Sequence, residues 1–473
     1  MLALALAAVV AAAQAPQDTL IYNLAVMPAE PHLSVEARLT DLDGSPVVLV
    51  MPPAATRAGT IIQGISATDD RGVPLPVTRD AQTFMLEPRA PGAIRFRYRI
   101  DFRDSIPEGS TSSGMSTHSL YAVTASLFVA PDPVVLRKIG RPYPAVRIRV
   151  LAPADWRVIS GYPTDGPVLE PAGGDELTGS TLAAAPDFRV YNDTAGGAPV
   201  TLAIRGHRYF SDSLLATVVK AALRKGEETL GPVPVARVTY TSDIGLKGRT
   251  SGSLQGDGSI GLVWEPGEVL ERARAHDTFH ETLHLWFGGA METERWWIEG
   301  VTDYFAARLL AAWRNNPGDL AALCYESYYN YLAIQHNTRL TMDEEARRGL
   351  LGDNTQLLVY RKGMLAGLLL DAAIRRATHG QRRLDDVARR MLALAATRQT
   401  HYIREDELRS AVRDVGGADA ALVWDHVVPS TELISAAEVT AALHDVTGMD
   451  FPLPPRLKPG KTFSGEMPPG VIR

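Results

Sequence analysis

The sequence HETLH, which begins at His280, contains the side chains best suited to chemistry. If this segment is helical, His280 and His284 lie on one face and can bind a single metal ion. Zinc is the usual metal for such a pair, and Glu281 would then act as the general base on a water activated by the metal. The alternative is a solvated polar face, but Phe279 and Phe287 lie at helical spacing beside the histidines and predict a helix packed against a core.

A catalytic zinc ion usually has three protein ligands and one open position, so a third ligand is needed. Glu299, in the segment WWIEGVTDYF, is the best candidate, and Asp303 lies four residues later on the same predicted helix face. Asp303 suits a different role, because zinc-bound histidines usually donate their other ring N–H to a carboxylate. The reverse assignment, with Asp303 as the ligand, and the alternative of two ordinary surface acids both stay open.

These two segments together resemble the gluzincin metallopeptidases, and most of all the glycyl aminopeptidase family, whose members often carry a PDZ domain. The resemblance implies a thermolysin-like catalytic domain in which Glu299 binds zinc. A later segment, which reads YRKG from Tyr360, is similar to the Y-x-K-G helix of the family. Carried over from related aminopeptidases, Tyr360 would stabilise the tetrahedral intermediate, since a phenol beside a metal can donate to an oxyanion. Without the zinc motif, a core tyrosine would be the preferred interpretation.

The chain also departs from the family pattern around the metal ligands. Fourteen residues, 285–298, separate His284 from Glu299, which is fewer than gluzincins usually have. We expect this short connection to open or reshape one rim of the active-site cleft. The stretch from about residue 447 is too short for a PDZ domain, so we do not expect that part of the family pattern here.

The candidate substrate-binding residues lie upstream of the HETLH segment. Family members have a G-G-L-E-H-like segment whose Glu helps to hold the substrate's amino terminus, and here GSLQG places Gln255 at that position. A neutral amide binds an ammonium group less strongly than a carboxylate does, but Asp257 could substitute. In gluzincins a strand just before the metal helix pairs with extended substrate, and residues 260–263, beginning with Ile260, are the candidates. An ordinary sheet strand is the alternative for them.

The composition is that of an ordinary soluble globular protein, with 45% hydrophobic and 22% charged residues among 473. This length allows two or three domains. A net charge of −6 and the absence of a basic run argue against nucleic acid as a partner. Cys324 is the only cysteine, so no intrachain disulfide can form, and we predict that it is a small buried hydrophobic residue.

Residues 1–15 are almost entirely apolar and end in Ala-Gln-Ala, which is typical of a secretory signal peptide. Cleavage is expected after Ala13 or after Ala15. The run is too short for a typical transmembrane helix, and no later stretch is long and apolar enough to span a bilayer. We therefore expect an exported protein, periplasmic or secreted, without stable membrane insertion.

The hydrophobic period changes along the chain and predicts an α+β multidomain protein. Residues 16–204 contain runs in which apolar and polar residues alternate, as in a β-sandwich-like N-terminal domain. Residues 205–446 begin with a helical period and are the expected catalytic domain, which is mainly helical. Residues 447–473 are a proline-rich tail.

The leading functional hypothesis is an exported metallopeptidase with one Zn²⁺ per chain and peptides as substrates. Its more specific form is an aminopeptidase that prefers small N-terminal residues, and endopeptidase action on short peptides is an alternative. The alternative that is not an enzyme is a peptide-binding protein that keeps the gluzincin fold without catalysis. The changed amine-binding segment and the short spacing between the ligands favour it. The intact HExxH motif argues against this alternative. The sequence gives no oligomeric state.

Overall fold

The computed structural model describes residues 19–51, 60–80, 82–102, 113–165, 168–171, 176–244, 251–255, 258–264, 267–338, 340–342, 344 and 357–454. The predicted signal peptide at residues 1–15, the candidate Asp257 and the tail beyond Pro454 lie outside these ranges. Within the described residues, no helix combines the length and the apolar character needed to cross a bilayer.

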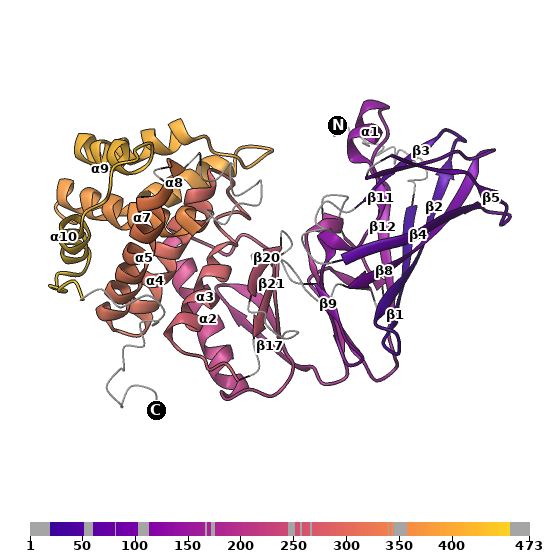
Figure 1. The fold of residues 1–473 in the computed structure, drawn as a ribbon, viewed down its shortest axis with the longest axis horizontal. Coiled ribbons are helices and arrows are strands. Elements are labelled where there is room, and N and C mark those ends of the chain that lie inside the picture. Colours follow the sequence, from indigo (N-terminus) through magenta and orange to yellow (C-terminus); the bar gives the residue numbers. More distant parts are fainter. Residues whose placement is uncertain are drawn as a thin grey trace, which may run out of the picture.

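The N-terminal part consists of β-sheets packed around one apolar core, which confirms the expected β-rich domain (Figure 1). An eight-stranded sheet contains, in spatial order, β14 (Thr164–Asp165), β15 (Val168–Leu169), β12 (Ala145–Leu151), β1 (Thr19–Met27), β2 (His32–Leu42), β8 (Gly92–Phe102), β4 (Thr60–Asp69) and β5 (Pro74–Leu75). One four-stranded sheet contains β13 (Arg157–Ser160), β16 (Thr181–Ala185), β10 (Leu120–Val123) and β9 (Gly114–Met115). Another contains β11 (Ala130–Pro131), β3 (Val47–Val50), β7 (Thr83–Leu86) and β6 (Val77–Asp80). The short elements are η1 (Thr124–Ser126), α1 (Pro133–Lys138) and η2 (Glu176–Thr178).

Alternating side chains explain this arrangement. Along β1 every second residue is buried, from Leu20 and Tyr22 onward, so one face of the strand points into the core. The Tyr22 hydroxyl donates a hydrogen bond to the Val129 carbonyl, at 2.8 Å, so its polar end is satisfied inside the core.

The second part is built on a five-stranded sheet covered by helices. The strands, in spatial order, are β17 (Arg189–Ala195), β18 (Ala198–Ile204), β19 (Val238–Ile244), β21 (Ser259–Trp264) and β20 (Ser251–Gln255). The helices are α2 (Asp212–Leu230), α3 (Arg272–Leu283), the π-helical turn η3 (Trp296–Val301), α4 (Thr302–Trp313), α5 (Pro317–Thr338), α7 (Leu357–Ala377), α8 (Leu384–Ala395), α9 (Glu405–Val427) and α10 (Ala436–Thr447). Figure 1 shows the sheet between α2 and α3 on one side and the N-terminal sheets on the other.

The pairing of this sheet differs from the sequence-based division at residue 204. Strand β18 pairs in parallel with β19, across the helix α2 that connects them. Residues 189–204, which we had assigned to the N-terminal domain, therefore pair with the strands of the helical part. Buried Ala203 and Val263 of this sheet pack against residues of the N-terminal sheets, among them Ala183, so the two parts share an apolar contact.

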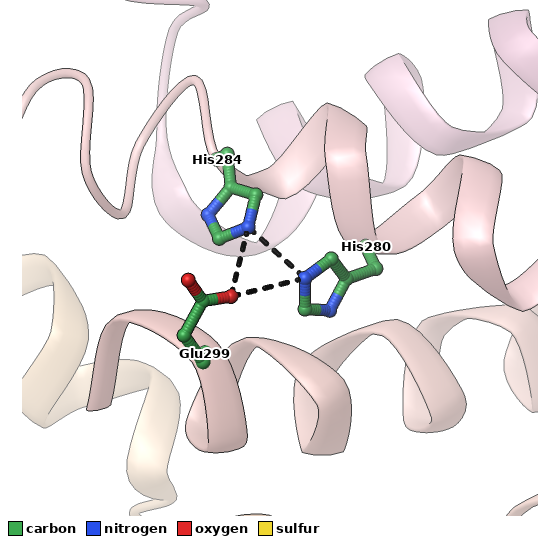
Figure 2. A group of neighbouring side chains, drawn as sticks. All are labelled: His280, His284 and Glu299. Carbon is green, nitrogen blue, oxygen red and sulfur yellow. Dashed lines mark hydrogen bonds and ion pairs between the residues drawn. The ribbon is translucent and has the colours of Figure 1, made fainter. Parts of the chain in front are cut away.

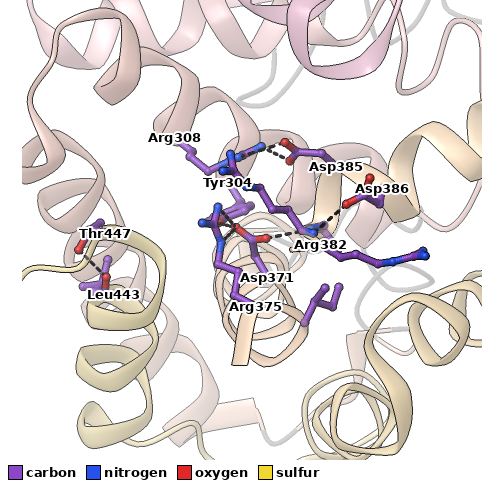
Figure 3. Close-up of polar contacts among 12 residues, drawn as sticks. Tyr304, Arg308, Asp371, Arg375, Arg382, Asp385, Asp386, Leu443 and Thr447 are labelled. Atoms are coloured by element: carbon purple, nitrogen blue, oxygen red, sulfur yellow. Dashed lines mark hydrogen bonds and ion pairs between the residues drawn. The ribbon is translucent and has the colours of Figure 1, made fainter. Parts of the chain in front are cut away.

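A buried polar network ties the helices of the second part together (Figure 3). Asp371 on α7 is fully buried and accepts hydrogen bonds from the Tyr304 hydroxyl of α4, at 2.5 Å, and from the Leu384 backbone N–H, at 2.8 Å. Arg375 also pairs with Asp371, at 3.1 Å, and Arg308 of α4 pairs with Asp385 of α8. Because a buried carboxylate is costly unless it is fully partnered, this network fixes α4 against α7 and α8.

Candidate metal centre

The HETLH segment is helical, as its spacing predicts. Helix α3 ends at Leu283, and His284 follows with helical backbone angles. Phe279 and Leu283 have no exposed surface and pack into the core of the helical part. Because they anchor one side of the helix, His280 and His284 extend from another side toward η3 (Figure 2).

Three of the predicted ligand residues converge on one point (Figure 2). The Nε2 atoms of His280 and His284 are 3.0 Å apart, and each lies 3.5 Å from Oε2 of Glu299. Tetrahedral zinc with ordinary bond lengths holds its ligand atoms about 3.4 Å apart, so the triangle matches a zinc site. The other candidate ligand, Asp303, lies outside this triangle.

Each histidine has a partner behind it that orients its ring. Nδ1 of His280 is 2.8 Å from Oδ1 of Asp303, and the His284 Nδ1–H donates to the Phe287 carbonyl, at 2.9 Å. With a proton on Nδ1, the lone pair of Nε2 faces the common point, as metal binding requires. The structure thus places Asp303 in the supporting position behind His280.

The charges around the triangle also suit a cation. Burial alone would lower the pKa of His280, but the charge and hydrogen bond of Asp303 outweigh it and raise this pKa well above its usual value. Burial alone would raise the pKa of Glu299, but hydrogen bonds to both histidines hold this pKa well below its usual value. The negative charges of Glu299 and Asp303 thus stabilise positive charge at the histidines. A divalent cation bound between the three ligand residues would take the place of the protons that the histidines otherwise bind.

Asp303→Asn is expected to weaken zinc binding by about 10- to 100-fold without unfolding the protein, because the amide cannot stabilise the His280 N–H as a carboxylate does. Zinc affinity can be measured by competition with a chromophoric chelator. Asp414→Asn, the same change on α9, is the control, since Asp414 pairs with Arg390 at 2.8 Å. Unchanged affinity in Asp303→Asn would contradict the supporting role.

A π-helical turn and two glycines bring Glu299 and the Tyr360 helix to the site. Glu299 lies within η3, and the next residue, Gly300, meets Gly363 of α7. A Cβ atom on Gly300 would lie 2.4 Å from Cα of Gly363, so only glycine permits this close approach. The contact places Tyr360, one helical turn before Gly363, beside the histidines.

Tyr360 and Glu281 complete the arrangement. The ring of Tyr360 lies against that of His280, with 6.1 Å between the ring centroids and 28° between the planes. Burial, and then the charge and hydrogen bond of Glu299, raise the pKa of Tyr360 well above its usual value, so the hydroxyl keeps its proton. Burial also raises the pKa of Glu281, which shifts this carboxylate toward the range of a useful base.

The structure places the three predicted substrate-binding residues differently from one another. Gln255 ends β20, the edge strand that runs beside α3, whereas Asp257 lies outside the described residues. Ile260 was wrongly assigned to substrate pairing. Its strand, β21, pairs with β19 on one side and with β20 on the other, so its backbone is not available to a peptide. Among the described strands, β17 and β20 form the two edges of this sheet, and β20 is the edge strand next to β21.

The sequence analysis missed two side chains near the site. His276, four residues before His280, lies 3.1 Å from the Asp303 carbonyl oxygen through Nε2. The four-residue spacing of three histidines is the signal that could have identified it. Glu292 lies in the connection between the ligands, where no periodicity marks it; the charges of His284 and Glu299 act on its carboxylate.

No family model and no curated protein matches this sequence. Solved structures nevertheless share its fold. An aminopeptidase N family protein from Idiomarina loihiensis has a TM-score of 0.72 and 15% identity, over 89% of this chain and 77% of that one. An M1 zinc metallopeptidase from Deinococcus radiodurans has a TM-score of 0.55 and 17% identity, over 89% of this chain and 94% of that one. The α+β fold expected from the change of hydrophobic period along the chain is confirmed.

Proposed function

We propose that this chain is a zinc-dependent metallopeptidase that hydrolyses peptide bonds. The observation that carries the proposal is the convergence of His280, His284 and Glu299 at tetrahedral zinc spacing, with Glu281 and Tyr360 beside them. The shared fold supports it, as do structures of variants of such enzymes. One, from Deinococcus radiodurans, is bound to a Tyr-Ser-Ala substrate, and a two-domain M1 zinc metallopeptidase is bound to L-arginine.

Glu281, Tyr360 and Asp303 each have a separate role in the proposed hydrolysis. A zinc ion, when bound, polarises the scissile carbonyl and lowers the pKa of water. Glu281 takes a proton from the attacking water and passes it to the leaving amine. The Tyr360 hydroxyl donates to the carbonyl oxygen of the substrate as negative charge develops there. Asp303 holds His280 in the required tautomer.

The finer parts of the proposal concern the site of cleavage and the location of the protein. We propose that the enzyme removes N-terminal residues, with a preference for small ones, and that it acts outside the cytoplasm. The first part rests on the likeness of the GSLQG and YRKG segments to those of aminopeptidases, and the second on residues 1–15 alone. Endopeptidase action on short peptides is the alternative to the first.

The purified chain, loaded with zinc and dialysed against a weak chelator, should retain about one zinc ion per chain. His284→Ala should retain less than about one tenth of that amount, since two ligands hold zinc far less well than three. Elemental analysis by mass spectrometry gives both values. His118→Ala, a change at an exposed histidine of the N-terminal part, is the control. A parent chain without zinc, or a His284→Ala variant with full zinc, would contradict the proposed centre.

A further inference from the structure

His276 is a buried side chain of α3 to which the proposed hydrolysis assigns no role. It lies four residues before His280, so these two histidines repeat the spacing of the pair formed by His280 and His284. The spacing alone would allow His276 to be a metal ligand. The structure argues against this role, because Nε2 of His276 lies 3.1 Å from the backbone carbonyl oxygen of Asp303 and is not among the converging ligand atoms.

The contact with Asp303 fixes the tautomer of His276. A carbonyl oxygen can only accept a hydrogen bond, so Nε2 of His276 carries the proton and donates it. The other ring nitrogen, Nδ1, lies 3.9 Å from Oδ1 of Asp277, which is too far for a hydrogen bond. The hydrogen bond of the His276 ring is therefore directed at Asp303, across the contact between α3 and α4.

This hydrogen bond joins the two segments that carry the metal ligands. Helix α3 contains His280, and His284 follows it directly. Glu299 lies in η3, which continues without a break into α4, and Asp303 is one helical turn further along. The bond from His276 to the Asp303 backbone thus fixes the segment of the third ligand against the helix of the first ligand.

The carboxylate of Asp303 connects His276 to the metal centre. Its Oδ1 atom lies 2.8 Å from Nδ1 of His280 and 3.8 Å from Nε2 of His276. All three residues are buried, with exposed fractions of 6 to 7%. Water therefore cannot readily replace a contact that is lost among them. Without the bond from His276, the Asp303 backbone is free to move away from α3, and the carboxylate that orients His280 moves with it.

We infer that His276 is a positioning residue of the metal centre. Its Nε2–H holds Asp303, and Asp303 in turn holds the His280 ring in the orientation that binds zinc. The inference rests on the metal centre of the proposed function and deepens it, because it names a side chain, neither a ligand nor in contact with one through a hydrogen bond, that sets the affinity for zinc. This affinity should depend on a hydrogen-bond donor at the position of Nε2 and not on an imidazole as such.

The test compares two amides at position 276 of the full chain. Glutamine carries its amide nitrogen at the ε position, as histidine carries Nε2, whereas the asparagine nitrogen is one bond closer to the backbone. His276→Gln should bind zinc within about twofold of the parent, and His276→Asn about 3- to 10-fold more weakly, the usual effect of one lost neutral hydrogen bond. His276→Met, which has no donor, should resemble His276→Asn. Competition with a chromophoric chelator gives the affinities, and thermal unfolding of the metal-free variants shows that each one is folded.

A double-mutant cycle separates positioning from a general effect on the structure. Asp303→Ala removes the carboxylate, so no group remains through which His276 can act on His280. In this background, His276→Met should change zinc affinity by less than about twofold, although it weakens binding in the parent. If His276→Met does not fold, His276→Asn takes its place in the cycle. His207→Met, the same change at an exposed histidine, is the control.

The inference is overturned if His276→Gln and His276→Asn bind zinc equally well. It is also overturned if His276→Met weakens zinc binding by the same factor with and without the Asp303 carboxylate, since His276 then acts by another route.

Zinc affinity is measured without hydrolysis, so the inference and the proposed function can fail separately. If the parent binds zinc but cleaves no peptide, the peptidase function fails, and the affinities still decide the role of His276. If the parent cleaves peptides but its zinc affinity does not depend on the residue at position 276, the function stands and the inference is wrong. A parent that binds no zinc would refute both.

Discussion

Glu281→Gln is expected to lower peptide hydrolysis by roughly 10³- to 10⁴-fold while the protein still binds zinc. The amide keeps the size of the side chain but cannot accept a proton from water. Glu281 is not one of the three residues whose ligand atoms converge, so zinc content should stay at the level of the parent. Burial raises the pKa of Glu281, which makes the carboxylate a better proton acceptor and, once protonated, a suitable donor to the leaving amine.

Hydrolysis of a peptide library, followed by mass spectrometry, measures this loss, and zinc is determined on the same samples. Glu326→Gln, the same change at an exposed position of α5, is the control. A Glu281→Gln variant that cleaves as fast as the parent would refute the assignment of the base. A zinc-loaded parent that binds peptides but cleaves none would instead favour the non-catalytic peptide-binding alternative.

The histidines could be predicted from the sequence because a helix fixes the relative position of residues four apart. The position of Glu299 was harder to predict, since the fourteen-residue connection is short. The structure places Glu299 within a π-helical turn, and such turns are rare, occur mostly inside α-helices and are frequent at functional sites. This turn packs against α7 through Gly300 and Gly363, a contact between segments some sixty residues apart that no local pattern reveals.

For the fold as well, local sequence patterns predicted single strands but not the order of strands in a sheet. Alternation along β1 identified the strand and its buried face, because side chains of a strand point to opposite faces in turn. The order of strands was not readable in the same way. Every residue of β21 is buried, and this local pattern does not show that β20 pairs with one side of the strand and so prevents residues 260–263 from pairing with substrate.

Tyr360→Phe should lower kcat by about 10²- to 10³-fold with little change in KM, the usual effect of removing one oxyanion donor. The hydroxyl is expected to act on charge that develops only in the transition state, so substrate binding should be largely unaffected. Because burial and the charge of Glu299 raise the pKa of Tyr360, its proton is present at neutral pH and can be donated. Phenylalanine preserves the ring that lies against His280, so folding should be unaffected.

Steady-state kinetics on a peptide with a free amino terminus, together with zinc analysis, tests this prediction. Tyr325→Phe is the matched control, because the Tyr325 hydroxyl donates to the Phe451 carbonyl, away from the metal ligands. If kcat of Tyr360→Phe stays within about threefold of the parent, Tyr360 is a packing residue and the oxyanion role is wrong. If zinc content falls in parallel with kcat, the hydroxyl acts through its hydrogen bond to Glu299, as a positioning group for the ligand and not as a donor to the substrate.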